Sequence, residues 1–189
     1  MDERDWSLSS EDLNASRKRR GSKALELTSP AFSDGGEIPR ECGYKNGNQE
    51  PPLRIGVVGG KELGSTGIYS LALIMDDPDA MEPAGKVWVH WVAWNFTWFA
   101  DGKPNWNSRH GAKQGMTDFG EVGYGGPAPP DKRHTYVFKL YALDTKLDLP
   151  VETHVEGQGW MSSSTKADVE KAMEGHIVDL ATLTGTYAP

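Results

Sequence analysis

Cysteine is nearly absent from this sequence: Cys42 is the only one in 189 residues. A single thiol excludes an intramolecular disulfide and any zinc site built from several cysteines. Since structural disulfides form in oxidising compartments, their absence favours a reducing, cytoplasmic setting. The sequence has no apolar run of the roughly 18 residues that cross a bilayer, and its acidic first residues do not resemble a signal peptide. We therefore expect no transmembrane segment.

Basic residues are also in deficit. The chain has 20 Lys and Arg against 27 Asp and Glu, a net charge of −7. A surface for nucleic-acid phosphates needs an excess of basic side chains, so this balance argues against a nucleic-acid partner. The basic cluster at 17–20 lies in a segment, 1–22, without hydrophobic periodicity. We interpret 1–22 as a disordered N-terminal arm and 23–189 as one domain.

Common catalytic and cofactor motifs are missing as well. The sequence has no G-x-S-x-G elbow, no H-E-x-x-H pair, no Walker loop and no dinucleotide fingerprint. Cys42 has no histidine near it in the sequence, and the glycines at 123–126 are followed by prolines instead of a helix start. We therefore expect no cofactor, and catalysis is only weakly supported.

The hydrophobic pattern that is present is that of a β protein. Three segments, 68–75, 86–95 and 136–143, have the apolar, β-branched and aromatic content of buried strands. Residues 23–29 and 177–187 predict an opening and a closing strand. The many Gly and Pro residues between 101 and 133 indicate a long loop region.

One helix is predicted in the C-terminal part. Thr165 is a candidate N-cap with Asp168 three residues later, apolar residues follow at helical spacing, and Gly175 marks the end. With so little helix, the fold class is mainly β, as an antiparallel β-sandwich with one or two short helices.

Strand alternation places a few polar side chains among these apolar ones. His134 and Tyr136 are expected on one face of their strand. The expected neighbours of His90 on its own face are Trp88, Val92 and Trp94. Asp77, fixed by Pro78 at the end of a buried strand, is the nearest acidic partner in sequence. An Asp beside two histidines could be a catalytic dyad, a metal site or an anion pocket with protonated imidazoles.

The order of these motifs resembles that of a known family. The motifs are DDPDA at 76–80, WVHWVAWN at 88–95, GYGGPAPP at 123–130 and HTYVFKLYALD at 134–144. Together they resemble the phosphatidylethanolamine-binding protein family, also called Raf kinase inhibitor-like proteins, over residues 23–188. The segments TSPAFSDGGEIP at 28–39 and AMEGHIV at 172–178 are similar to its bacterial and archaeal branch.

The resemblance implies a compact β-sandwich with a surface pocket for phosphate-like anions, including the phosphorylethanolamine headgroup. The matching ligand-binding positions are Asp77, His90, Gly126, Pro127, Pro129, Pro130, His134 and Tyr136. Asp79 is expected to brace the turn. The chain departs from the family pattern at Met81, which replaces a proline, at Thr135, which replaces an arginine, in the short 131–133 stretch and in an apparent insertion at 152–164. The resemblance also implies that the C-terminal helix of the animal proteins is missing, so we do not expect animal-type kinase regulation.

Three functions follow from these observations. The leading one is a non-enzymatic binding and regulatory protein. It would capture a small phosphate-containing anion or phospholipid headgroup and could inhibit a kinase or a serine protease. The second is a hydrolase with an Asp77–His pair as general base. The third, a metal site from Asp77, His90 and His134, lacks the tighter ligand spacing of such sites, so we expect no metal. The Trp-rich stretch 91–106 is compatible with a homodimer.

Overall fold

The computed structural model describes residues 25–57, 67–105, 112–155 and 159–189. The expected N-terminal arm, 1–22, lies outside the described residues, so the domain boundary stays a prediction. None of the described helices has both the length and the apolar character needed to cross a membrane.

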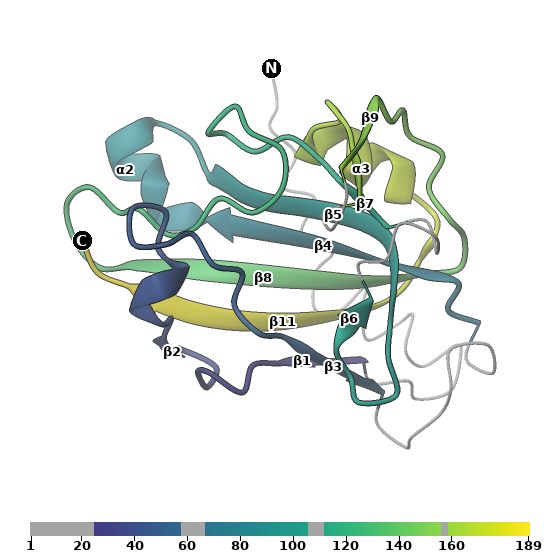
Figure 1. Ribbon diagram of the computed structural model, residues 1–189, viewed down its shortest axis with the longest axis horizontal. Helices are drawn as coiled ribbons and strands as arrows, with labels where there is room; N and C mark the ends of the chain where they lie inside the picture. The colour runs from purple at the N-terminus through teal and green to yellow at the C-terminus, as the bar shows by residue number, and fades with distance from the viewer. Residues whose placement is uncertain (1–24, 58–66, 106–111, 156–158) are drawn as a thin grey trace.

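One large sheet forms the centre of the described structure (Figure 1). Its strands follow the order β2-β11-β8-β4-β5-β7-β10-β9, with β6 also paired to β5. The bounds are β2 Gly36–Glu37, β4 Ser70–Asp77, β5 Trp88–Trp98, β6 Pro104–Asn105, β7 Lys113–Gln114, β8 His134–Leu143, β9 Thr153–Val155, β10 Gly159–Met161 and β11 Ile177–Tyr187. Most pairs are antiparallel, whereas β10–β7 and β11–β2 are parallel. The three strands with the clearest sequence signals, β4, β5 and β8, lie side by side in this sheet.

Smaller elements surround the sheet. A separate antiparallel pair is formed by β1 (Leu25–Thr28) and β3 (Arg54–Val57). The described helices are η1 Arg40–Cys42, η3 Pro78–Ala80, α2 Met81–Ala84 and α3 Lys166–Met173. The structure therefore confirms the mainly β class.

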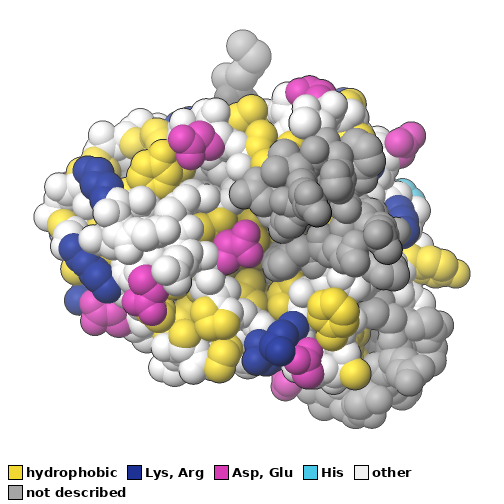
Figure 2. Space-filling view, viewed as in Figure 1, with side chains coloured by type: hydrophobic (Ala, Val, Ile, Leu, Met, Phe, Trp, Pro, Cys, Tyr) yellow, Lys and Arg dark blue, Asp and Glu magenta, His cyan; other side chains and the backbone are white. Residues whose placement is uncertain are grey.

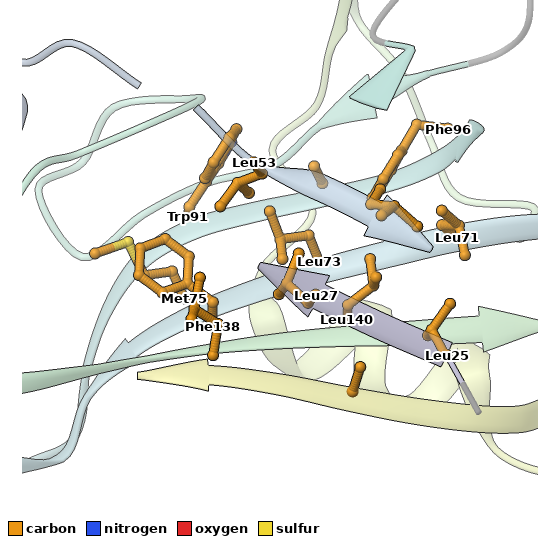
Figure 3. Packing of buried hydrophobic residues seen from close by; sticks show 14 of the residues in the cluster. Leu25, Leu27, Leu53, Leu71, Leu73, Met75, Trp91, Phe96, Phe138 and Leu140 are labelled. Carbon is orange, nitrogen blue, oxygen red and sulfur yellow. The ribbon is translucent and has the colours of Figure 1, made fainter. Parts of the chain in front are cut away.

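Strand β4 is buried along its whole length because both faces of the sheet are covered. On one face, leucines of β1 and the residue before β3 pack against β4, β5 and β8, as Figure 3 shows. On the other face, Val169 and Met173 of α3 pack against Ile74, Val92 and Trp94. The second sheet of the expected sandwich is thus only two strands wide, and a helix covers the opposite face of the large sheet.

The tryptophans of β5 belong to this core. Trp91 and Trp94 are 1% and 0% exposed, and Trp98 is partly buried against the core. The expectation that they form a Trp-rich surface for a homodimer is therefore wrong for Trp91 and Trp94. The reason is that β5 is an inner strand with both faces covered. Trp106 lies outside the described residues.

The predicted N-terminus of helix α3 is confirmed. Thr165 Oγ1 accepts from the Asp168 backbone amide, and Asp168 Oδ2 accepts from the Thr165 amide at 2.8 Å, which together make a capping box. The box satisfies two amides that have no partner inside the helix. Gly175, at φ 78°, follows the helix end at a left-handed position that glycine adopts without strain.

We expect Thr165→Ala to lower the free energy of unfolding by about 1 kcal/mol, because the N-cap acceptor is lost. Urea unfolding measures the change. Thr165→Ser keeps the hydroxyl that accepts from the Asp168 amide, so its free energy of unfolding should stay close to that of the original protein. Equal stability of the Ala and Ser variants would show that the cap contributes nothing.

Candidate functional site

Four polar side chains meet where the ends of three adjacent strands lie together. Asp77 ends β4, His90 lies near the start of β5, and His134 and Tyr136 lie at the start of β8. We call these four residues the polar cluster. Their exposed fractions are 3%, 2%, 0% and 0% in that order. The antiparallel pairing of β4 with both neighbours explains the convergence, because the end of β4 meets the starts of β5 and β8.

A β-bulge orients His90. Met75 pairs with Trp91 and the next residue, Asp76, pairs with Val89, so His90 is the extra residue on β5. The His90 ring contacts the Tyr136 ring edge-on at 5.0 Å, on the face that Trp91 also covers. Val92 and Trp94 pack on the α3 face. The expectation that His90 shares a face with Val92 and Trp94 is therefore wrong, because the bulge resets the alternation.

His134 is held between two carboxylates. Its Nδ1 lies 2.8 Å from Asp77 Oδ2 and its Nε2 lies 2.8 Å from Asp131 Oδ1. With both carboxylates ionised, both ring nitrogens donate, which is the arrangement of an imidazolium. Burial disfavours that charge, but the hydrogen bonds to Asp77 and Asp131 outweigh it and raise the pKa of His134. Sequence reasoning missed Asp131; its position three residues before His134 is the only signal that could have found it.

His90 has the opposite electrostatic environment. Its Nδ1 donates to the Gly125 carbonyl at 2.6 Å, and burial lowers the pKa of the ring despite that bond and the nearby Asp77. The neutral ring therefore carries its proton on Nδ1. Its Nε2 is left as an acceptor that faces Asp77 Oδ2 at 4.0 Å. Two acceptors at this separation favour a proton donor between them.

The hydroxyl of Tyr136 is the least satisfied group of the cluster. Its oxygen is buried, and no described residue meets full hydrogen-bond geometry with it, although the Asp77 carboxylate and the Ala128 backbone lie close enough to affect its pKa. Burial and the nearby Asp77 carboxylate raise the pKa of this phenol, so it keeps its proton. An unpaired buried hydroxyl costs roughly 1–3 kcal/mol. The cluster therefore contains a donor that no described residue fully satisfies.

Residues 123–130, which we call the Gly-Pro loop, hold His90 in place from one side. Gly125 N donates back to the His90 carbonyl at 2.7 Å, so strand and loop are joined twice. The Gly126 amide donates to Asn48 Oδ1 at 2.7 Å, and the Pro127 carbonyl accepts from the Tyr44 amide at 2.9 Å. These bonds tie the loop to residues 42–48. The Gly126 amide is thus already paired in this structure. Pro127 and Pro129 are buried and Pro130 is exposed.

Aromatic side chains lie around His90, of which sequence reasoning named Trp88 but not Phe119 or Tyr44. Phe119 meets the His90 ring edge-on at 5.3 Å and Trp88 edge-on at 5.5 Å. Tyr44 stacks on Phe119 at 4.2 Å. These rings give the cluster an apolar border, which strengthens electrostatic contacts inside it. Asp79 stands apart and accepts from the Thr135 amide at 2.7 Å, so it braces the start of β8 as expected.

The cluster does not have the layout of a metal centre. Among the described residues, no three His, Cys, Asp or Glu side chains are arranged to hold a metal ion. On the face shown in Figure 2, acidic and basic side chains are interspersed and no patch of one sign dominates.

Comparison with known proteins agrees with this architecture. The family model described as phosphatidylethanolamine-binding protein matches residues 28–188. A UPF0098 protein of Methanothermobacter thermautotrophicus is 40% identical over 168 residues, which cover 86% of this chain and 98% of the relative. The crystal structure of a putative phosphatidylethanolamine-binding protein homolog from Chlamydia trachomatis superposes with a TM-score of 0.69 at 33% identity, covering 88% of this chain and 98% of that one.

A second crystal structure, E. coli YbcL, has a TM-score of 0.65 at 30% identity, over 86% of this chain and 97% of that chain. Its description places it with the mammalian members of the same family. Sequence and fold therefore agree over nearly the whole of the described domain. The chain belongs to the phosphatidylethanolamine-binding protein family, in its bacterial and archaeal branch.

Proposed function

We propose that this protein is a non-enzymatic binding protein whose polar cluster takes a phosphate-like anion, either a phosphorylethanolamine headgroup or a phosphorylated partner. The observation that carries the proposal is the buried Tyr136 hydroxyl, which no described residue satisfies with full hydrogen-bond geometry. A protein interior keeps such a group only at a cost. A ligand oxygen beside Tyr136 Oη would accept a hydrogen bond from the hydroxyl and so remove the free-energy cost of leaving it unpaired.

The cluster also sets the protonation of the ligand. His90 Nε2 and Asp77 Oδ2 are both acceptors and lie 4.0 Å apart. An anion can bind there if His90 takes up a proton, or if the ligand brings one. A phosphate monoester, with a second pKa near 6, carries a P–OH group in part of its population close to neutral pH. Binding should therefore weaken as pH rises above the histidine range.

Tyr136→Phe tests the proposal because it should weaken anion binding without lowering the stability of the fold. Removing the unpaired hydroxyl should leave the free energy of unfolding unchanged or raise it by about 1 kcal/mol. It should also weaken the binding of phosphorylethanolamine roughly tenfold, since one hydrogen bond to a charged group is lost. Urea unfolding and isothermal titration calorimetry at pH 6.5 measure the two quantities.

Tyr187→Phe is the matched control on the neighbouring strand β11. The Tyr187 hydroxyl donates to the Arg40 carbonyl at 2.9 Å and accepts from Asn46 at 2.7 Å. Its loss should destabilise the fold and leave the anion affinity unchanged. If Tyr136→Phe behaves in the same way, with lower stability and unaltered binding, the cluster is structural and the proposal is wrong.

The hydrolase alternative has less support. A general base needs a free nitrogen facing the reacting water or hydroxyl. Both nitrogens of His134 are bonded to carboxylates. His90 Nε2 is free to accept a proton, but no Ser, Thr or Cys of the described residues is hydrogen-bonded to the His90 ring, so the structure shows no side-chain nucleophile for it to activate. Inhibition of a kinase or a serine protease, a homodimer and a cytoplasmic location remain proposals that rest on the family resemblance and on composition.

A further inference from the structure

The outward nitrogen of His134 is already occupied by a carboxylate of the chain itself. His134 has no exposed surface, and its Nδ1 is bonded to the deeper Asp77. Its Nε2 contacts Asp131 Oδ1 at 2.8 Å, and the Asp131 side chain is 40% exposed. Asp131 thus lies between the imidazolium and the solvent. No ligand oxygen can accept from His134 while this contact is made.

We propose that Asp131 is an internal competitor that occupies the anion position on His134 and is displaced when a ligand binds. This inference rests on the proposed function, because it assumes that the cluster takes an anion. The exchange replaces one anionic oxygen by another, so the His134 charge is never left unpaired in the protein interior. Asp131 therefore lowers the affinity for every anion that uses His134.

The segment that carries Asp131 is suited to such a release. Residues 130–133 are all exposed and lie in no helix or strand. The two neighbouring ion pairs, Lys132 with Glu82 and Arg133 with Glu37, also lie at the surface. Surface pairs of this kind contribute little to stability. A displaced Asp131 carboxylate would move directly into water, where its charge is well solvated.

Calorimetric titration with inorganic phosphate and with acetate at pH 7.5 tests the inference. Asp131→Ala should bind phosphate roughly 3- to 10-fold more tightly than the original protein, as expected for the loss of a partly exposed ion pair. Asp131→Asn should lie between the two, because its amide oxygen still accepts from His134 without the charge. Acetate should gain by a similar factor, since both anions displace the same carboxylate.

Glu82→Gln is the matched control, because it removes the same charge nearby without touching His134. This substitution should change the affinity for phosphate and the affinity for acetate by no more than about twofold. General repulsion, by contrast, would favour the doubly charged phosphate over acetate in both the Asp131 and Glu82 variants. Nuclear magnetic resonance of the unliganded protein gives an independent measurement: the pKa of His134 should fall in Asp131→Ala, because a hydrogen bond that raises it is lost.

The outcomes separate this inference from the proposed function. Equal phosphate affinity of the original protein and Asp131→Ala would overturn the inference and leave the anion site standing. A gain for phosphate alone, shared by Glu82→Gln, would also overturn it. If neither protein binds phosphate, both proposals fail. Binding that is seen only in Asp131→Ala would support the inference directly.

Discussion

Gly126→Ala is expected to lower the free energy of unfolding by about 3 kcal/mol or more. A Cβ at this position would lie 2.0 Å from the Cys42 carbonyl oxygen and 2.8 Å from the Tyr44 amide nitrogen. Both are backbone atoms, so neither can swing aside as a side chain would. The two loops would have to separate, which breaks the bonds from Gly126 to Asn48 and from Tyr44 to Pro127.

Thermal and urea unfolding measure this loss, which corresponds to a fall in melting temperature of roughly 6–12 °C for a chain of this size. Gly56→Ala on β3 is the matched control, because its Cβ would meet only the Glu26 side chain at an ordinary 3.5 Å. Equal midpoints for the two variants would show that the loops separate without cost. The resemblance marked Gly126 as a ligand-binding residue; the structure supplies a packing reason for a glycine there.

Asp77→Asn is expected to destabilise the protein by about 3 kcal/mol at pH 6.5, since it breaks a buried charged pair with His134. Asparagine keeps the shape and can still cap η3 through its side-chain oxygen, as Asp77 does for the Ala80 amide. The loss therefore reports the charge. A double-mutant cycle with His134→Gln isolates the coupling between the two residues. Additive single effects would contradict a stabilising pair.

The pKa of His134 determines whether the stability of the protein rises or falls with pH. The folded pKa of His134 is raised above its ordinary value of 6.5. Its contribution to stability is thus fully present below pH 6.5 and is lost as pH rises through the folded pKa. His90, with a lowered pKa, contributes above pH 6.5 and loses its share as pH falls. Between pH 6.5 and 8.5 the contribution of His134 therefore falls while that of His90 still rises slightly, and the net decline in stability should be smaller in Asp77→Asn.

The same variant separates binding from catalysis. If the cluster binds anions, Asp77→Asn should weaken the binding of phosphorylethanolamine, because His134 loses the partner that keeps it charged. A hydrolysis of phosphate esters that disappears in Asp77→Asn, with fold and binding intact, would establish the hydrolase instead. Asp101→Asn, at an exposed site, controls for the loss of one negative charge.

Much of the fold could be predicted because its signals are local. The apolar runs that became β4, β5 and β8 are long, and the Thr165 to Asp168 spacing identifies the start of α3. The candidate site could be assembled only in part. Motif order brought His90, His134 and Asp77 together, but alternation alone placed His90 on the wrong face. A strand that is apolar on both faces has no polar–apolar alternation, so its sequence pattern cannot reveal where a bulge adds a residue.

The contacts across the site were less accessible still. Asp131 is an exposed loop residue whose role depends on how the 130–133 segment meets His134. Phe119 reaches His90 from a loop nearly thirty residues further along the chain. The missing partner of Tyr136 is a property of the packed state and has no signature in the sequence. These features arise from tertiary contacts between segments far apart in the chain, which local sequence patterns do not reveal.

Strand β5 has a second irregularity, and the two together behave like a pair of compensating frameshifts. Leu71 pairs with Phe96 and Ala72 with Trp94, so Asn95, at φ 57°, is another extra residue. Between the two insertions, odd-numbered residues such as Trp91 face the β1–β3 side. Beyond the second, even-numbered residues such as Phe96 face it, and before the first, the odd-numbered Val89 packs on the opposite face. Deleting an extra residue together with its bulge would leave every other side chain on its present face, because Val89 and Trp91, or Trp94 and Phe96, already lie on opposite faces. Keeping the residue but losing its bulge would instead turn every later side chain of β5 to the wrong face.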